Sequence, residues 1–261
     1  MICASHVGGQ PSLNSHTLTH RMAHVVLVHG AWQDSTGWSA VAARLRADGH
    51  TVTAPDLPGH GMDRTPLSGQ TLDAYAATVL RAIDAAPAPV MLVGHSMGGI
   101  VISTVAELRP DRIARLVYVA AYLLADGQSI QATSATDAES KLGAAMRPSA
   151  DWSTVALDAS DAAALFANGC TPAIAAAAVA AMQPEATAPF ATPVHTTSAR
   201  FGTVPRSYIT TRNDFVVSPS LQDRMVALLP CAPVIALQTG HLPFLAAPDD
   251  FAQVLLALLV P

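Results

Sequence analysis

The sequence is poor in cysteine. Its three cysteines are odd in number and widely spaced, and no two of them form a C-x-x-C pair; they are Cys3, Cys170 and Cys231. The pattern therefore indicates neither a zinc site nor a dithiol redox motif. This cysteine usage favours a reduced, cytoplasmic compartment.

Charged residues are also scarce, at 13% of the 261 residues, with a formal net charge of −5. The few Lys and Arg residues are scattered rather than gathered into a basic stripe, which argues against nucleic acid as a partner. No apolar run reaches the roughly 18 to 20 residues that a membrane-spanning helix needs, so we expect a soluble protein with no membrane partner. These features leave the oligomeric state open, a homodimer included.

The first 21 residues carry small and polar side chains but no apolar h-region, so they do not resemble a secretory signal. We interpret residues 1–21 as a flexible N-terminal leader, with Met22 as an alternative start. Hydrophobic residues make up 51% of the chain, which predicts a globular protein with a large core. One domain is the simplest organisation for this length.

From Ala23 onward, short Val-rich runs alternate with segments of helical periodicity. This alternation predicts an α/β fold whose central sheet is mostly parallel and covered by helices on both faces. Most of the runs are continuously apolar rather than alternating, as in strands that are buried on both sides. The expected strands are 24–28, 51–54, 90–93, 116–120, 207–210 and 234–237.

The expected helices carry recognisable end signals. Segment 71–86 has its apolar residues on one helical face, with Thr71 as the N-cap and Pro87 as the stop. Other helices are expected at 38–47, from 99 onward, and at 220–229 and 250–259.

One connection is far too long for an ordinary loop, since about 80 residues separate the strand that ends near Tyr122 from the next one. We interpret residues 125–203 as an inserted helical cap, and residues 22–124 with 204–261 as the core. The clearest helix of the cap is Ala173–Met182, with Thr171 as its N-cap and Pro172 at its first position.

The strongest chemical signal is the pentapeptide Gly94-His95-Ser96-Met97-Gly98, a G-x-S-x-G motif between a buried strand and a helix. A serine on such a sharp turn has strained backbone angles, and the flanking glycines remove Cβ atoms that would collide there. The turn exposes the serine at the edge of the sheet, beside the N-terminus of the following helix. Ser96 is therefore the predicted nucleophile.

A serine hydroxyl needs a base that accepts its proton. His241 follows the last expected strand and precedes the closing helix, which is where this motif places its histidine. His195 is the rival, but it lies in the cap among Thr and Pro residues, where a surface histidine is the more ordinary interpretation.

An acid must orient the imidazole. Asp214 follows an expected strand end and precedes His241, so it is the favoured candidate. Asp223 is a rival inside an expected helix, and Asp126 is a rival after the preceding strand.

Two backbone N–H groups are needed for the oxyanion. One is expected from Met97, the residue after the nucleophile, and the other from Ala31 in the loop after the first strand. Trp32 in that loop is either a substrate contact or a packing residue.

Five stretches resemble the α/β-hydrolase superfamily, and within it the branch of plant methyl esterases and hydroxynitrile lyases with their bacterial relatives. They are VVLVHGAW at 25–32, GHTVTAPDL at 49–57, GHSMGG at 94–99, the run from Tyr208 to Asp214, and Gly240-His241. The resemblance spans residues 24–261. Within this branch the chain is similar to a bacterial-type esterase.

What the resemblance implies is a serine esterase of the α/β-hydrolase fold. Carried over position by position, it makes Ser96 the nucleophile, Asp214 the acid and His241 the base. It makes the N–H groups of Ala31 and Met97 the oxyanion donors. It implies an acyl-enzyme on Ser96, release of an alcohol, a small-molecule ester as partner, and no metal or organic cofactor.

The chain departs from the lyases of this branch at two positions. Those lyases place a Lys directly after the catalytic histidine and a Thr at the position of Gly30, whereas here Leu242 follows His241. Both groups that handle cyanide are missing, so a hydrolase is favoured over a lyase. The apolar composition of the cap predicts a small or medium, largely apolar ester, with Trp32 and Leu242 as substrate contacts.

Two other functions stay open at this stage. A ligand-binding, receptor-like protein would keep the triad as a pocket without turnover, and a lyase such as a hydroxynitrile lyase would use the same triad differently. Haloalkane dehalogenases and epoxide hydrolases of this fold use an Asp nucleophile, so Ser96 argues against both.

Overall fold

Six parallel strands form the central sheet, in the order β2-β1-β3-β4-β8-β9. The structure is a computed structural model and describes residues 22–259, so the leader predicted at 1–21 lies outside the described residues. The strands are β1 (His24–Val28), β2 (Thr51–Thr53), β3 (Val90–His95), β4 (Ile113–Val119), β8 (Arg206–Thr211) and β9 (Val234–Leu237).

All six predicted strands are confirmed, and the largest difference is at the start of β4. This strand begins at Ile113, three residues before the predicted start at Leu116, and Ile113 pairs with Val90 of β3. The exposed Ala114 and the polar Arg115 interrupt the apolar run there, so the pattern hid these residues. The central strands β3 and β1 are buried almost throughout, as a parallel sheet covered on both faces requires.

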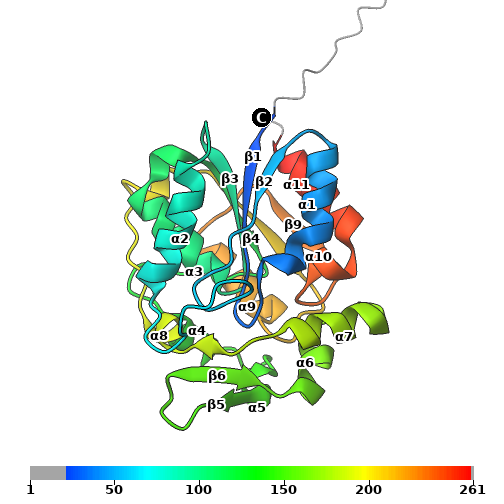
Figure 1. Cartoon of the computed structure of the whole chain (residues 1–261). Coiled ribbons are helices and arrows are strands. Elements are labelled where there is room, and N and C mark those ends of the chain that lie inside the picture. The colour runs from blue at the N-terminus through cyan, green and yellow to red at the C-terminus, as the bar shows by residue number, and fades with distance from the viewer. Residues whose placement is uncertain (1–21, 260–261) are drawn as a thin grey trace, which may run out of the picture.

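Helices cover both faces of the sheet (Figure 1). Helices α2 (Leu72–Asp84) and α3 (Gly98–Leu108) lie on one face, and α1 (Ser39–Ala47), α10 (Pro243–Ala246) and α11 (Pro248–Leu259) lie on the other. Helix α9 (Pro219–Leu228) connects β8 to β9, and short 3-10 turns occupy Ser35–Trp38, Pro110–Arg112 and Phe201–Thr203. The predicted N-cap of α2 is confirmed, because Thr71 Oγ1 accepts from Ala74 N at 3.2 Å.

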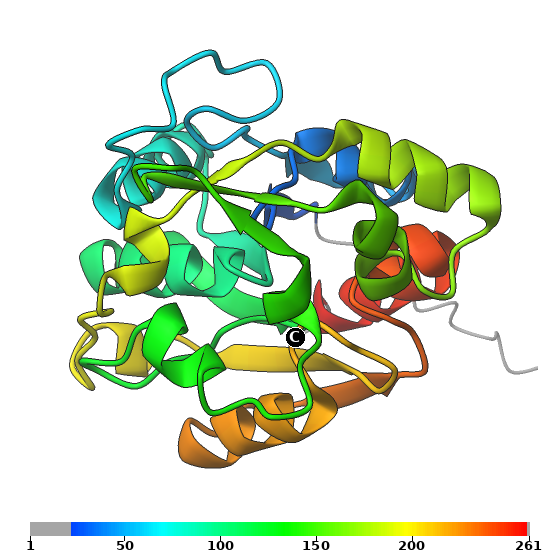
Figure 2. The same cartoon turned by 90° about the horizontal axis from the view of Figure 1, so that it is seen from below.

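The long connection between β4 and β8 folds across the carboxyl ends of the strands, as the view from below shows (Figure 2). It contains α4 (Ile130–Ser134), α5 (Leu142–Ala145), β5 (Met146–Pro148), β6 (Thr154–Leu157), α6 (Ala159–Phe166), α7 (Pro172–Ala181), β7 (Glu185–Ala186) and α8 (Ala188–Ala191). Strands β5, β6 and β7 form a small antiparallel sheet in a region where we expected helices. Strands of two to four residues are too short to show an alternating pattern.

Among residues 22–259, none of the helices combines the length and the apolarity needed to cross a bilayer.

Candidate active site

Ser96 lies on the sharp turn between β3 and α3. Its φ is +53°, a left-handed conformation that a residue with a Cβ atom rarely adopts. Hydrogen bonds hold the turn, since Ser96 N donates to Val119 O at 3.2 Å and Ser96 O accepts from Tyr122 N at 3.1 Å. A Cβ atom at Gly94 would lie 2.6 Å from the carbonyl oxygen of Gly98, so the first glycine of the motif is sterically required.

Asp214 and His241 meet at the carboxyl ends of β8 and β9, although they are 27 residues apart in the chain. His241 Nδ1 lies 2.8 Å from Asp214 Oδ2, and both side chains are fully buried. Because Asp214 Oδ2 is an acceptor, this contact fixes the proton on Nδ1 and leaves the lone pair on Nε2. His241 Nε2 is buried and has no hydrogen-bond partner among residues 22–259.

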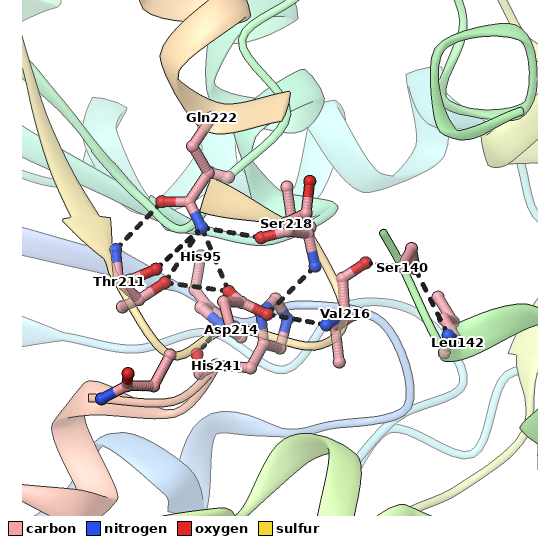
Figure 3. A network of polar contacts seen from close by, with 12 residues as sticks. His95, Ser140, Leu142, Thr211, Asp214, Val216, Ser218, Gln222 and His241 are labelled. Carbon is pink, nitrogen blue, oxygen red and sulfur yellow. Dashed lines mark hydrogen bonds and ion pairs between the residues drawn. The ribbon is translucent and has the colours of Figure 1, made fainter. Parts of the chain in front are cut away.

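The carboxylate of Asp214 accepts hydrogen bonds on both oxygens (Figure 3). Its Oδ1 accepts from the backbone N–H groups of Val216 and Val217, at 2.8 and 3.0 Å. Its Oδ2 accepts from Thr211 Oγ1 at 2.8 Å and from Gln222 Nε2 at 3.3 Å, beside the contact with His241. These donors set the orientation of the carboxylate.

The side chain of His95 joins the loop of His241 to the serine turn. His95 Nε2 donates to the carbonyl oxygen of His241 at 2.9 Å, and the two imidazole rings are 4.6 Å apart. Ser96 follows His95 directly, so this bond holds the predicted base beside the predicted nucleophile. No hydrogen bond between Ser96 Oγ and His241 Nε2 forms in the described chain, and in unliganded enzymes this bond is often loose until substrate binds.

Two backbone N–H groups beside Ser96 are free to donate. Neither the N–H of Ala31 nor that of Met97 bonds to an acceptor among residues 22–259. Both residues line the same cavity as Ser96. Unpaired donors in such a position can stabilise a developing oxyanion.

The cavity over Ser96 has a volume of about 360 Å³ and no charged side chain in its wall. It lies between the ends of the strands and the connection from β4 to β8. Its wall is formed by Ala31, Trp32, Ser96, Met97, Tyr122, Ile130, Gln131, Ser134, Leu142, Met146, Pro148, Trp152, Val155, Thr187, Ala188, Phe190, Ala191 and Val216.

The two predicted substrate contacts lie in different cavities. Trp32 lines the cavity of Ser96 and also packs, because its ring lies 5.7 Å from the rings of Phe166 and Phe190. Leu242 is buried and lines a second, smaller cavity of about 210 Å³ between α7 and α10.

The rival residues lie at the surface. His195 is exposed and lies 3.6 Å from Asp126, while Asp223 pairs with Arg212 at 2.8 Å. None of these rivals lines the cavity of Ser96.

Sequence reasoning missed the residues that support the acid. Gln222, which is fully buried on α9, contacts Thr211, Asp214 and the carbonyl oxygen of Val217. Asp137 in the long connection accepts from Ser218 N at 3.0 Å and so ties the loop after Asp214 to that connection. A polar residue on a helix, such as Gln222, or in a loop, such as Asp137, usually faces solvent, so neither position carried a signal.

Gln222→Met is expected to lower both stability and turnover. The change leaves Thr211 N and Val217 O without their side-chain partners in a buried site, at a cost of about 2 to 4 kcal/mol in the free energy of unfolding. Asp214 also loses one donor, and a fall of about tenfold in kcat for an ester substrate is expected. Urea unfolding and steady-state kinetics measure both effects. Gln253→Met, at an exposed position of α11, is the control, and an unchanged kcat and stability in Gln222→Met would contradict this role.

The chain is similar in sequence to ester hydrolases from plants and bacteria. It is 31% identical to putative methylesterase 11, chloroplastic, of Arabidopsis thaliana over 90% of this chain and 63% of that protein. It is 30% identical to pyrethroid hydrolase of Sphingobium wenxiniae over 88% of this chain and 85% of that protein. The chain thus spans less than two thirds of the plant relative's length.

The fold is shared with solved structures. The pyrethroid hydrolase of Sphingobium faniae superposes with a TM-score of 0.78 at 27% identity, covering 91% of this chain and 97% of that one. The model of the alpha/beta hydrolase family matches residues 25–254. The chain therefore belongs to the alpha/beta hydrolase family.

Proposed function

We propose that the protein is a carboxylic ester hydrolase that acts through an acyl-enzyme on Ser96. Asp214 is the acid that orients His241, and His241 is the general base. The N–H groups of Ala31 and Met97 form the oxyanion hole.

The reaction follows from these positions. His241 Nε2 takes the proton of Ser96 Oγ as the oxygen attacks the ester carbonyl, and the N–H groups of Ala31 and Met97 bind the resulting oxyanion. The tetrahedral intermediate collapses, the bond to the alcohol oxygen breaks, and the imidazolium protonates the leaving alcohol. His241 then removes a proton from water as the water oxygen attacks the acyl carbonyl. The second tetrahedral intermediate collapses, the bond to Ser96 Oγ breaks, and the imidazolium returns the proton to Ser96 Oγ as the acid is released.

The observation that carries the proposal is the buried contact of 2.8 Å between His241 Nδ1 and Asp214 Oδ2. It sets the tautomer whose unpartnered Nε2 can accept a proton. The strained turn at Ser96 and the free N–H groups beside it supply the remaining parts of a serine hydrolase.

The wall of the cavity supports an uncharged, largely apolar substrate of small or medium size. A volume of about 360 Å³ is within the range of small-molecule sites. Methyl esters and pyrethroid esters, the substrate classes in the names of the relatives, have this character. We propose Trp32 as a substrate contact, residues 125–203 as the cap that closes the cavity, and Leu242 as a contact only for a substrate that extends toward α7.

Gly30 supports hydrolysis over cyanohydrin cleavage. A Cβ atom at this position would lie 2.8 Å from both His95 Nδ1 and Ser96 Cβ. The threonine that lyases of the branch place there would therefore collide with the serine turn.

Two aryl esters that differ only in charge test this proposal. We expect the protein to hydrolyse a short-chain aryl ester such as an aryl butyrate. A matched ester with a terminal carboxylate, such as an aryl hemisuccinate, is expected to have a kcat/KM lower by about tenfold or more, because the cavity would bury its charge without a partner. Equal kcat/KM values would contradict the proposed substrate class, and no turnover of any neutral ester would contradict the proposed function.

A further inference from the structure

A second buried polar cluster lies away from the triad, where strand β7 meets the core. It consists of Glu185 on β7, Tyr75 on α2, and His60 in the loop between β2 and α2, and all three side chains are fully buried. Tyr75 Oη donates to Glu185 Oε1 at 2.5 Å, and Ala186 N donates to the same oxygen at 2.8 Å. His60 Nε2 lies 3.1 Å from the other oxygen, Glu185 Oε2.

The protons of this cluster can be assigned from its acceptors. His60 Nδ1 faces the carbonyl oxygen of Pro58 at 3.2 Å, so Nδ1 carries a proton. Tyr75 Oη and Ala186 N both donate to Glu185 Oε1, so this oxygen is an acceptor and carries no proton. A lone pair on His60 Nε2 would then face an anionic oxygen and repel it, so Nε2 also carries a proton. The contact is therefore an ion pair between an imidazolium and a carboxylate, close but without good hydrogen-bond alignment.

The surroundings of His60 agree with a charged imidazole. Burial disfavours the imidazolium, but the close contact with the Glu185 carboxylate and its charge outweigh it, and the pKa of His60 is raised above its usual value. The other groups that face His60 are Tyr75, Asp63 and His29. Burial, and then the charge of His60, lower the pKa of His29 to about 4, so His29 stays neutral. Asp63 is only partly exposed, and water screens part of its charge.

This cluster is connected to the loop that carries Ala31. The ring of His60 lies 5.3 Å from that of His29, whose Nε2 accepts from Leu57 N at 3.0 Å. On the other side, Glu185 pairs in register with Val155, whose carbonyl oxygen accepts from Trp32 Nε1 at 2.9 Å.

Gln183 also links the loop that carries His60 to the loop that carries Ala31 and Trp32. Its backbone N–H donates to Trp32 O at 3.0 Å, and its Oε1 accepts from Gly61 N, next to His60, at 2.7 Å. The strand of Glu185 and the loop of His60 therefore hold both ends of residues 29–32.

We propose that Glu185 and His60 form a titratable latch that fastens β7 to the core and positions the oxyanion loop. The positioning part rests on the proposed function, whereas the fastening of β7 does not. Because the pKa of His60 is higher in the folded protein than in the unfolded chain, the latch contributes its full stability at acidic pH. That contribution is lost as the pH rises through the pKa of folded His60, where the buried carboxylate of Glu185 loses its counter-charge.

The variant Glu185→Gln distinguishes the effect of the charge pair between residue 185 and His60 from the effect of the hydrogen bonds of residue 185. The amide oxygen can accept from Tyr75 Oη and Ala186 N, and the amide nitrogen can donate to Nε2 of a neutral His60. The variant thus keeps the contacts and removes the buried charge. Glu139→Gln, an exposed carboxylate in the same connection, is the matched control.

The experiment measures the thermal midpoint and ester kinetics from pH 6 to pH 10 for the full chain. As the pH rises, we expect the thermal midpoints of the wild type and of Glu139→Gln to fall by about 2 to 4 °C more than that of Glu185→Gln. We also expect an alkaline fall of about tenfold in kcat, with little change in KM, that Glu185→Gln lacks. If the thermal midpoint changed equally with pH in Glu185→Gln and in the wild type, the proposed latch would be overturned.

A measurement on the wild type keeps the proposal testable if Glu185→Gln does not fold. The ¹⁵N signals of the His60 ring report its protonation directly, and an imidazolium at pH 6 is expected. A neutral His60 at pH 6 would overturn the latch. Both the thermal slopes and the ring signals are independent of turnover, so a protein that hydrolyses no ester would refute the proposed function and leave the latch to be judged on these two readouts.

Discussion

Ser96→Ala is expected to lower kcat for a short-chain aryl ester by about 10⁶-fold, the scale of loss when a serine hydrolase loses its nucleophile. The alanine removes the only oxygen that can form the acyl-enzyme at the turn between β3 and α3. It adds no atoms, and the φ of +53° at position 96 is already tolerated with a Cβ atom, so the fold should persist. Circular dichroism and the thermal midpoint check that expectation.

Labelling with a fluorophosphonate probe provides an independent readout of the same substitution. The probe should modify the wild type at Ser96, as peptide mass spectrometry can locate, and it should not modify Ser96→Ala. Ser103→Ala is the matched control, because Ser103 is a buried serine of α3 whose hydroxyl bonds to Gly99 O and Tyr118 Oη. Turnover at the wild-type level in Ser96→Ala, or labelling elsewhere, would reject the assignment.

Asp214→Asn is expected to lower kcat by about 10⁴-fold while the fold is kept. The orientation of the new amide is determined by its neighbours. The backbone N–H groups of Val216 and Val217 cannot turn away from the position of Oδ1, so the amide oxygen is expected there. The amide nitrogen then faces His241, on the side where the hydroxyl of Thr211 can rotate and accept. An N–H donor facing Nδ1 selects the tautomer with its proton on Nε2, and that tautomer cannot accept the proton of Ser96.

The kinetics of this variant distinguish a wrong tautomer from a distorted site. We expect the loss in kcat with KM within a few fold of the wild type, since Asp214 does not line the cavity. Asp223→Asn is the control, because Asp223 is exposed and pairs with Arg212. A larger loss in Asp223→Asn than in Asp214→Asn would transfer the role of the acid to the rival residue.

The fold could be predicted because its signals are local. Continuous apolar runs marked most strands of the sheet, and side-chain oxygens that cap helices marked the starts of α2 and α7. The prediction weakened where elements were short. Strands β5, β6 and β7 escaped it because alternation needs more residues than they contain.

The candidate site was partly predictable for the same reason. Ser96 stands in a motif of five residues in which a Cβ atom at Gly94 would meet the carbonyl oxygen of Gly98, so this part of the turn is determined locally. His241 and Asp214 could be proposed from their order along the chain. Gln222 and Glu185 could not, because a Gln on α9 and a Glu on the two-residue strand β7 are ordinary surface residues until the rest of the chain covers them.

By itself, the sequence determined the order of the elements, the strained turn and the residue types available for chemistry, since these depend on neighbours along the chain. Only the tertiary structure decided which of those residues meet. The bond from His95 to His241 spans 146 residues and that from Tyr75 to Glu185 spans 110. Such contacts arise because parallel strands end at the same edge of the sheet and the connection from β4 to β8 folds over that edge. Polar groups that are buried there must form hydrogen bonds with one another, because a buried polar group without a partner costs free energy.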